Sequence, residues 1–269
     1  MASSTNVTLE TSPKKRKLPS ESDSEYSNQS MPTIDVRIVE KILNVNFADL
    51  IGGAQTQNLQ REIGELVPPE ALMTKLFDSL YEKLQVRRYP SYLTPEANVT
   101  SFVSHILECV IYHLTVELEL ESRAILILPE EELNLTSEQL LLKLTGKADY
   151  LVVHSNGSNY ERLVVIEVKR AIDDGIKQCL LCAKNSYHAN SEKRKIYCFT
   201  TDAAHWRLIT YNEGDNGESV IQMFPQKALM IEDMVSADSK ELWRSLCGSG
   251  IGMVYSVMKK VMSNCTKKI

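Results

Sequence analysis

The sequence contains no apolar run that approaches the roughly 20 residues needed to cross a membrane. Its N-terminus also lacks the apolar stretch of a signal peptide. Internal repeats are absent, as are a Gly-x-Ser-x-Gly nucleophile turn and a His-Glu-x-x-His zinc sequence. We therefore expect a soluble intracellular protein that uses neither of these two kinds of catalytic site.

An excess of positive charge is missing as well. The 269-residue chain has 30 Lys and Arg against 35 Asp and Glu, which gives a formal net charge of −5 and a pI of about 5.7. Nonspecific nucleic-acid binding normally depends on basic side chains that neutralise phosphates. The composition therefore disfavours a broad nucleic-acid-binding surface, and any such contact has to come from a local basic strip.

Cysteine is sparse and shows no paired framework. The six residues are Cys109, Cys179, Cys182, Cys198, Cys247 and Cys265. Most of them lie inside apolar helical or strand patterns, which is typical of reduced core thiols. Cys179 and Cys182 have a spacing that also suits zinc or redox chemistry, but no second pair accompanies them. We expect core thiols rather than zinc ligands.

Residues 1–32 form a separate N-terminal segment. Ser, Thr, Asn and acidic residues dominate it without apolar periodicity, so we expect disorder. Its one dense basic cluster consists of Lys14, Lys15, Arg16 and Lys17, with a proline on either side. Such a cluster is typical of a nuclear-import signal, and the alternative is a basic tail that binds any polyanion. We expect an import receptor as a partner and the nucleus as the location.

Residues 33–99 are predicted to form a helical N-terminal elaboration. Helical patterns at residues 39–43 and 71–84 alternate with breakers at Gly52-Gly53 and Pro68-Pro69. Nothing in this region indicates a chemical function.

Residues 100–269 are predicted to form one α/β domain with helices at its C-terminal end. The last two helices are expected at residues 242–246 and 254–262. The glycine-rich run at 248–252 lacks the preceding strand and the following Lys-Ser/Thr of a phosphate-binding loop. We expect this run to be a turn between the two helices.

A β-hairpin is predicted near the middle of the chain. Two runs rich in β-branched residues, 151–153 and 163–168, flank a turn sequence at 155–159. A hairpin centred on Ser158 places Asp149 opposite Glu167. Because side chains alternate along a strand, Lys169 then shares a face with Glu167. Apolar residues occur on both faces of the hairpin, so helices are expected to cover both sides of this sheet.

This hairpin predicts a metal site. Two carboxylates that face each other in a sheet repel, and burying them uncompensated costs several kcal/mol, as a rough scale. Mg²⁺ or Mn²⁺ held by Asp149 and Glu167 would offset that repulsion, because such ions take one or two carboxylates, waters and phosphate oxygens. Lys169 could orient or deprotonate water or stabilise a phosphate in the transition state. The alternative is a solvated Glu and Lys at the end of a strand.

With these residues the chain resembles the PD-(D/E)xK, or restriction-endonuclease-like, superfamily. The resemblance covers roughly residues 100–212 and consists of Gly146-x-x-Asp149, Ile166-Glu167-Val168-Lys169, a helix carrying Gln178, and a strand at 195–202. The continuation through Trp206 resembles Crinkler-type eukaryotic nuclease-like domains. The resemblance implies an α-β-β-β-α-β core with a mixed sheet flanked by helices, and Mg²⁺-dependent phosphodiester hydrolysis. Many members have lost catalysis and keep only a binding role.

The chain departs from this pattern in two places. Ala148 stands where the proline that names the motif would be, which removes no ligand. Some relatives carry a tyrosine four residues after the helix glutamine, whereas here Cys182 follows Gln178 at that spacing. Gln178 also lies off the apolar stripe of its helix. It is therefore either a catalytic candidate or a solvated helix residue.

Relatives often add an acid from the first core helix, which is predicted here at residues 101–118. Glu117 and Glu121 continue the apolar face of this helix, and Glu108 does not. We expect Glu117 to be a third metal ligand. The alternative is that the helix frays at this end and that both acids are solvated.

The function indicated is Mg²⁺- or Mn²⁺-dependent cleavage of nucleic acid. Arg170, Lys177 and Lys184 are the expected contacts to the nucleic acid, within a basic strip that continues to Lys193, Arg194 and Lys195, although the same residues could simply solvate a helix face. The alternative function is a catalytically inactive nuclear module that binds nucleic acid or a protein partner. A cytosolic interaction domain remains if the hairpin is wrong.

Overall fold

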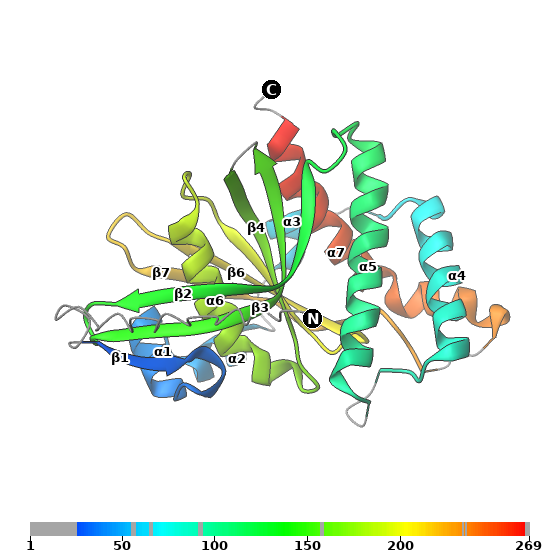
Figure 1. Ribbon diagram of the computed structural model, residues 1–269. Coiled ribbons are helices and arrows are strands. Elements are labelled where there is room, and N and C mark those ends of the chain that lie inside the picture. The colour runs from blue at the N-terminus through cyan, green and yellow to red at the C-terminus, as the bar shows by residue number, and fades with distance from the viewer. Residues whose placement is uncertain are drawn as a thin grey trace, which may run out of the picture.

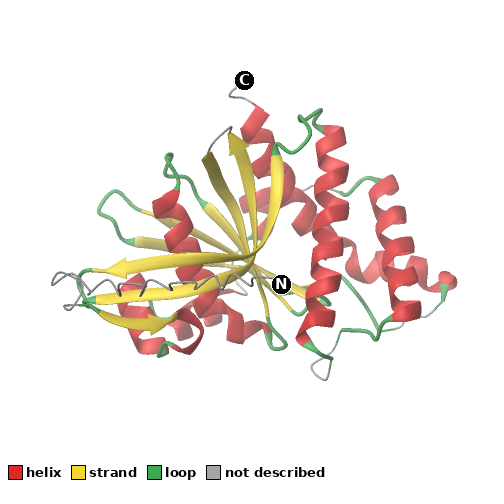
Figure 2. Ribbon diagram, viewed as in Figure 1, coloured by secondary structure: helices red, strands yellow, loops and turns green. Residues whose placement is uncertain are grey.

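One twisted mixed sheet separates two groups of helices in the computed structural model, which describes residues 26–54, 58–64, 67–90, 94–156, 159–232, 234 and 236–266 (Figure 1, Figure 2). The strands of this eight-stranded sheet are β1 Ser27–Ser30, β2 Ile125–Ser137, β3 Leu142–Asn156, β4 Asn159–Val168, β5 Ile196–Thr201, β6 His205–Glu213, β7 Ser219–Met223 and β8 Lys227–Ala228. Strands β2, β3 and β4 are antiparallel neighbours, β5 runs parallel to β4, and β6 and β7 continue antiparallel.

Helices cover both faces of the sheet. They are α1 Val36–Leu43, α2 Phe47–Gly53, α3 Leu59–Ile63, α4 Glu70–Val86, α5 Glu96–Glu117, α6 Ile176–Ala189 and α7 Lys240–Thr266, with short 3₁₀ turns η2 Met31–Thr33, η4 Ile172–Gly175 and η5 Ala237–Ser239. The expected α/β class with a mixed sheet flanked by helices is confirmed. Its central elements follow the order α5, β2, β3, β4, α6, β5.

The sheet divides the interior into two apolar cores. On one face, α4, α5 and α7 pack against Val164, Ile166 and Val168 of β4. On the other face, α1 and α6 pack against Val165. Strand β4 therefore places alternate residues in different cores, which confirms the expectation that helices cover both sides.

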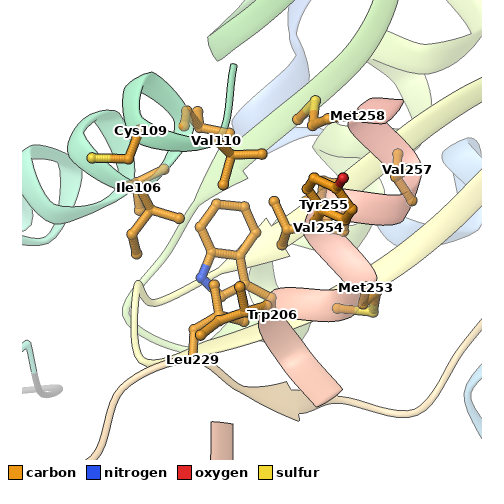
Figure 3. Close-up of a cluster of buried hydrophobic side chains, with 14 of the residues drawn as sticks. Ile106, Cys109, Val110, Trp206, Leu229, Met253, Val254, Tyr255, Val257 and Met258 are labelled. Carbon is orange, nitrogen blue, oxygen red and sulfur yellow. The ribbon is translucent and has the colours of Figure 1, made fainter. Parts of the chain in front are cut away.

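Trp206 of β6 stands at the centre of the first core. Figure 3 shows its ring among side chains of α5, such as Ile106 and Val110, and of α7, such as Val254. Its indole Nε1 donates to the Ala203 carbonyl at 3.0 Å, so the buried polar atom is satisfied. This packing fixes α5 and α7 against the same strand.

Helix α5 is the one helix of the described chain that is long and apolar enough, by length and composition, to cross a membrane. Most of its apolar residues, including the fully buried Phe102 and Ile106, lie in the first core, whereas Tyr112 and Val116 are exposed. A core helix passes the same test of length and composition. The packing of α5 accounts for its apolar character.

The N-terminal boundary differs from the expectation. Residues 27–32 were expected to be part of a disordered tail, but Ser27–Ser30 forms β1 and pairs parallel with residues 142–145 of β3. Met31 follows as a fully buried anchor in the second core. The polar strand has no apolar periodicity because backbone pairing and this single side chain hold it in place. The basic cluster at 14–17 lies outside the described residues.

The C-terminal end also differs from the expectation. The two predicted helices and their glycine turn are one continuous helix, α7. A Cβ atom on Gly250 would lie 2.0 Å from the Ala228 carbonyl oxygen, far inside van der Waals contact. This glycine therefore serves the close approach of α7 to β8 and does not break the helix.

Gly250→Ala should destabilise the fold because neither backbone segment can yield to the new methyl group. We expect a loss of about 1–3 kcal/mol in the free energy of unfolding, the usual scale of overpacking. Gly248→Ala on the same helix is the matched control, since a Cβ atom there meets nothing within 4 Å. It should be neutral or stabilising by up to about 1 kcal/mol. Urea unfolding of both variants measures the difference, and equal effects would contradict the proposed clash.

Candidate active site

The candidate site lies where β3 changes partners along one edge. Residues 142–145 of β3 pair with β1, and residues 150–156 pair with β4. Between these two ladders, the described strands leave residues 146–149 without a partner on that edge. Backbone groups in such a gap need other partners, because an unsatisfied buried group is costly.

Three side chains occupy this gap in place of a strand. Met31 packs so closely against Gly146 that a Cβ atom there would lie 2.8 Å from its Cβ and Sδ atoms. Gln178 Nε2 donates to the Lys147 carbonyl at 2.8 Å. Asp149 Oδ2 accepts a hydrogen bond from the Val168 amide at 2.7 Å. The Asp149 side chain thus joins β3 to β4 just beyond the end of their ladder.

The hairpin register brings Asp149 and Glu167 together as predicted. Tyr150 pairs with Ile166, so the two acids are the next opposed positions of the two strands. Nearer the turn, a register shift between Val152 and Val153 moves the pairing by one residue. The backbone pairing of residues 150–152 with 164–166 therefore positions the two acids. The predicted register, centred on Ser158, holds for these pairs but not for the pairs nearer the turn.

Lys169 lies within reach of both acids. Its Nζ is 2.6 Å from Glu167 Oε1 and 3.9 Å from Asp149 Oδ2. Glu167 is fully buried, and neither of its oxygens accepts a hydrogen bond of normal geometry despite the close ammonium. A buried carboxylate with its lone pairs unused is unusual unless it binds something further.

Burial dominates the electrostatics of the site. It raises the pKa of Glu167 from its ordinary 4.5 to about 8; the Asp149 charge adds to this rise, and Lys169 opposes it. Burial also raises the pKa of Asp149, against the Val168 amide and Lys169. Burial alone would lower the pKa of Lys169, but the two acids raise it. The Lys169 ammonium is therefore the one positive charge near both acids, at a site with little solvent.

Two further residues that the sequence did not single out contact the site. A Cβ atom on Gly175 would lie 3.2 Å from the Cγ atoms of Glu167 and Lys169, so any larger residue here would press on both side chains. Thr200 pairs with Glu167 across β4 and β5. It is fully buried, and its hydroxyl has no hydrogen-bond partner in the described part of the chain. Neither residue carries a sequence signal, since their roles depend on the pairing of distant segments.

The acid expected from the first core helix is a different one. Glu117 is the last residue of α5, where it accepts a hydrogen bond from Tyr255 at 2.6 Å and pairs with Lys259 of α7. Glu96, the first residue of α5, is close enough that its charge raises the pKa of both Asp149 and Lys169. At about 1.5 Å of rise per residue, the ends of this 22-residue helix are about 30 Å apart. The expectation of Glu117 as a metal ligand is therefore wrong.

Gln178 is not a solvated helix residue. Its side chain is 5% exposed and is bonded to the Lys147 carbonyl, two residues before Asp149. It supports the strand that carries Asp149 and has no recorded contact with the acids themselves. The apolar stripe of α6 does not predict this burial, because the face of α6 that meets β3 is wider than the stripe and includes Gln178, which bonds to the Lys147 carbonyl.

The predicted basic strip does not form one surface. Lys177 donates to the Ile34 carbonyl at 2.9 Å, and Lys184 pairs with Glu213 at 2.9 Å. The rest of the strip is also engaged, as Lys193 bonds to carbonyls at the end of α6, Arg194 pairs with Glu192, and Lys195 pairs with Glu62. Of the three expected nucleic-acid contacts, Arg170 is exposed next to Lys169. The side chains of Lys177 and Lys184 instead make contacts within the protein.

The donor set suits a hard divalent cation with many waters. Among the described residues no group of three or more His, Cys, Asp and Glu side chains is arranged to hold a metal. Asp149 and Glu167 provide two carboxylates, and the oxygens of Glu167 accept no hydrogen bond among the described residues. One or two carboxylates are what Mg²⁺ typically takes from a protein. No family model matches the sequence, and a search of curated proteins finds no match. The chemistry of this site therefore has to be inferred from its own residues.

The raised pKa of Glu167 predicts a pH-dependent stability. Below about pH 4.5 its carboxyl is protonated in both the folded and unfolded states. Between about 4.5 and 8 only the unfolded state releases the proton, so the free energy of unfolding of the metal-free protein should fall by a few kcal/mol in order of magnitude. Glu167→Gln should remove most of this decline. Urea unfolding from pH 5 to pH 8.5 measures it, and parallel curves for the two proteins would contradict the assignment.

Proposed function

We propose that this protein is a divalent-metal-dependent nuclease that hydrolyses phosphodiester bonds of nucleic acid. In this proposal Asp149 and Glu167 hold Mg²⁺ or Mn²⁺, and Lys169 acts on the water or the phosphate. The observation that carries the proposal is the fully buried Glu167 carboxylate, with unused lone pairs, beside a second acid and a lysine. Desolvated acids with perturbed pKa values concentrate at functional sites.

The order of the elements supports a restriction-endonuclease-like core. The chain runs α5, β2, β3, β4, α6, β5, and the acids lie on β3 and β4. In the PD-(D/E)xK superfamily that the sequence resembles, this order places the acids and the lysine on the corresponding strands. Glu96, at the start of α5, is the acid of the first helix in this proposal.

Each residue has a distinct role in the proposed hydrolysis. A bound divalent cation would lower the pKa of a water and stabilise charge on the phosphate. The water oxygen forms a bond to phosphorus while the bond to one ester oxygen breaks. Lys169, held between the acids, is placed to orient that water or to stabilise the growing negative charge. The Val168 amide fixes the Asp149 carboxylate through its hydrogen bond.

A second candidate is a catalytically inactive module that keeps this fold for binding. The observation that favours it is the 2.6 Å approach of Lys169 to Glu167, which offsets the buried acid without any cation. The internal engagement of Lys177 and Lys184 also leaves less basic surface for nucleic acid. A protein partner then becomes more suitable than nucleic acid. Nuclear import through residues 14–17 remains a proposal for either function.

The nuclease proposal predicts that metal binding depends on both acids. Mg²⁺ or Mn²⁺ should raise the melting temperature of the wild type, and the rise should increase from pH 6 to pH 8, because the cation competes with the proton on Glu167. Asp149→Asn and Glu167→Gln should show a much smaller rise. Thermal unfolding with and without metal measures this, and identical shifts in all three proteins would exclude the site.

Catalysis is tested by removing the lysine. Lys169→Ala should lower the rate of cleavage of mixed nucleic acids by about 100-fold or more, the usual scale for one such group. Lys147→Ala is the matched control, since Lys147 is on the same strand as Asp149 but pairs at the surface with Glu130. If the purified wild type cleaves nothing in Mg²⁺ or Mn²⁺ yet binds a partner, the inactive module replaces the nuclease.

A further inference from the structure

A large cavity lies on the opposite side of the sheet from the acids. It has a volume of about 890 Å³, is open to solvent on one side, and is lined by α3, the start of α4, the chain at 225–227 and α7. Helix α7 packs in the first core, whereas Gly175 of the acid site leads into α6, which packs in the second core. A volume of a few hundred to about 1,000 Å³ is the usual range of small-molecule sites.

The α7 wall of this cavity is flat. Gly248 and Gly252 line it one helical turn apart. Glycine weakens a helix interior, so its presence usually reflects a close approach by another group. Gly250 has such a reason in the Ala228 carbonyl, but a Cβ atom on Gly248 meets nothing within 4 Å. The space in front of Gly248 is therefore available to a ligand.

Two hydrogen-bond donors on the cavity wall, Ser256 and Lys227, have no side-chain partner among the described residues. Ser256 is 1% exposed and lines the cavity. Lys227, on the adjoining strand β8, likewise has no ion pair or hydrogen bond among the described residues. Glu70, the one acid among the described lining residues, is already paired with Arg244. The Lys227 ammonium and the Ser256 hydroxyl are therefore among the polar groups left for a ligand.

The wall also has an apolar part. Leu59, Ile63, Met73, Pro225 and Met253 belong to it. A ligand that satisfies both parts needs an apolar body and one acidic group. We propose that this cavity is a binding site for a small amphipathic anion, whose acidic group lies at Lys227 and Ser256 and whose apolar body lies along the glycine face of α7. This site is independent of the proposed nuclease function.

The probe for this site is anilinonaphthalene sulfonate, an apolar anion whose fluorescence rises in apolar surroundings. The folded wild-type protein should bind it saturably in a one-to-one complex. Decanoate should displace it, and the uncharged decanol should do so at least about tenfold less well, because a hydrogen bond to a charged group contributes on this scale.

Two variants test the two halves of the site. Gly248→Leu should abolish probe binding, since its side chain enters the open space, while the melting temperature stays the same or rises. Lys227→Met should weaken decanoate binding at least about tenfold and leave decanol binding unchanged. Lys75→Met, at an exposed lysine of α4 outside the cavity, is the charge control and should change neither.

The outcomes separate the proposal from its alternatives. Absence of saturable binding by the wild type, or equal binding by the wild type and Gly248→Leu, would overturn the site. Equal losses of decanoate and decanol in Lys227→Met would show an apolar pocket without anion recognition and would overturn the assigned ligand class. None of these results depends on Asp149 or Glu167, so they leave the nuclease proposal to its own tests.

Discussion

The hydrogen bond from the Val168 amide to Asp149 is the contact on which the site depends. It joins β3 to β4 just where their backbone ladder ends, and it holds a carboxylate beside the buried Glu167. The gap that makes this bond possible exists because β1 takes over the same edge of β3 farther along. The sheet therefore creates the position of the two acids by leaving part of β3 without a strand partner on this edge.

Much of the site could be predicted from the sequence because it depends on local rules. Strand alternation and one turn were enough to bring Asp149, Glu167 and Lys169 together, and the bulge beyond Val152 did not disturb them. The covering of both sheet faces also followed from the apolar residues on each side of β4. To predict these features it is enough to know that side chains alternate along a strand and which residues are charged.

The features that were missed depend on contacts between distant segments. Gly250 resembled a helix breaker, yet its role is set by the Ala228 carbonyl, which no local pattern contains. Glu96 was missed because the first core helix was predicted to begin only at residue 101, and because no local pattern shows which end of α5 meets β3. The prediction of a basic strip failed for the same reason. Lys177 donates a hydrogen bond to the carbonyl of Ile34, which lies far earlier in the chain.

The position of Met31 has a consequence for the tolerance of this protein to shortening. Removal of residues ahead of Tyr26 leaves every pairing of β1 intact, whereas removal through Ile34 would uncover the edge of β3 next to the acids and would free Lys177. An uncovered strand edge is open to pairing with another molecule. Segment 27–34 thus covers this strand edge, and a shortened protein without it would expose both the edge and the part of the second core that Met31 and Ile34 fill.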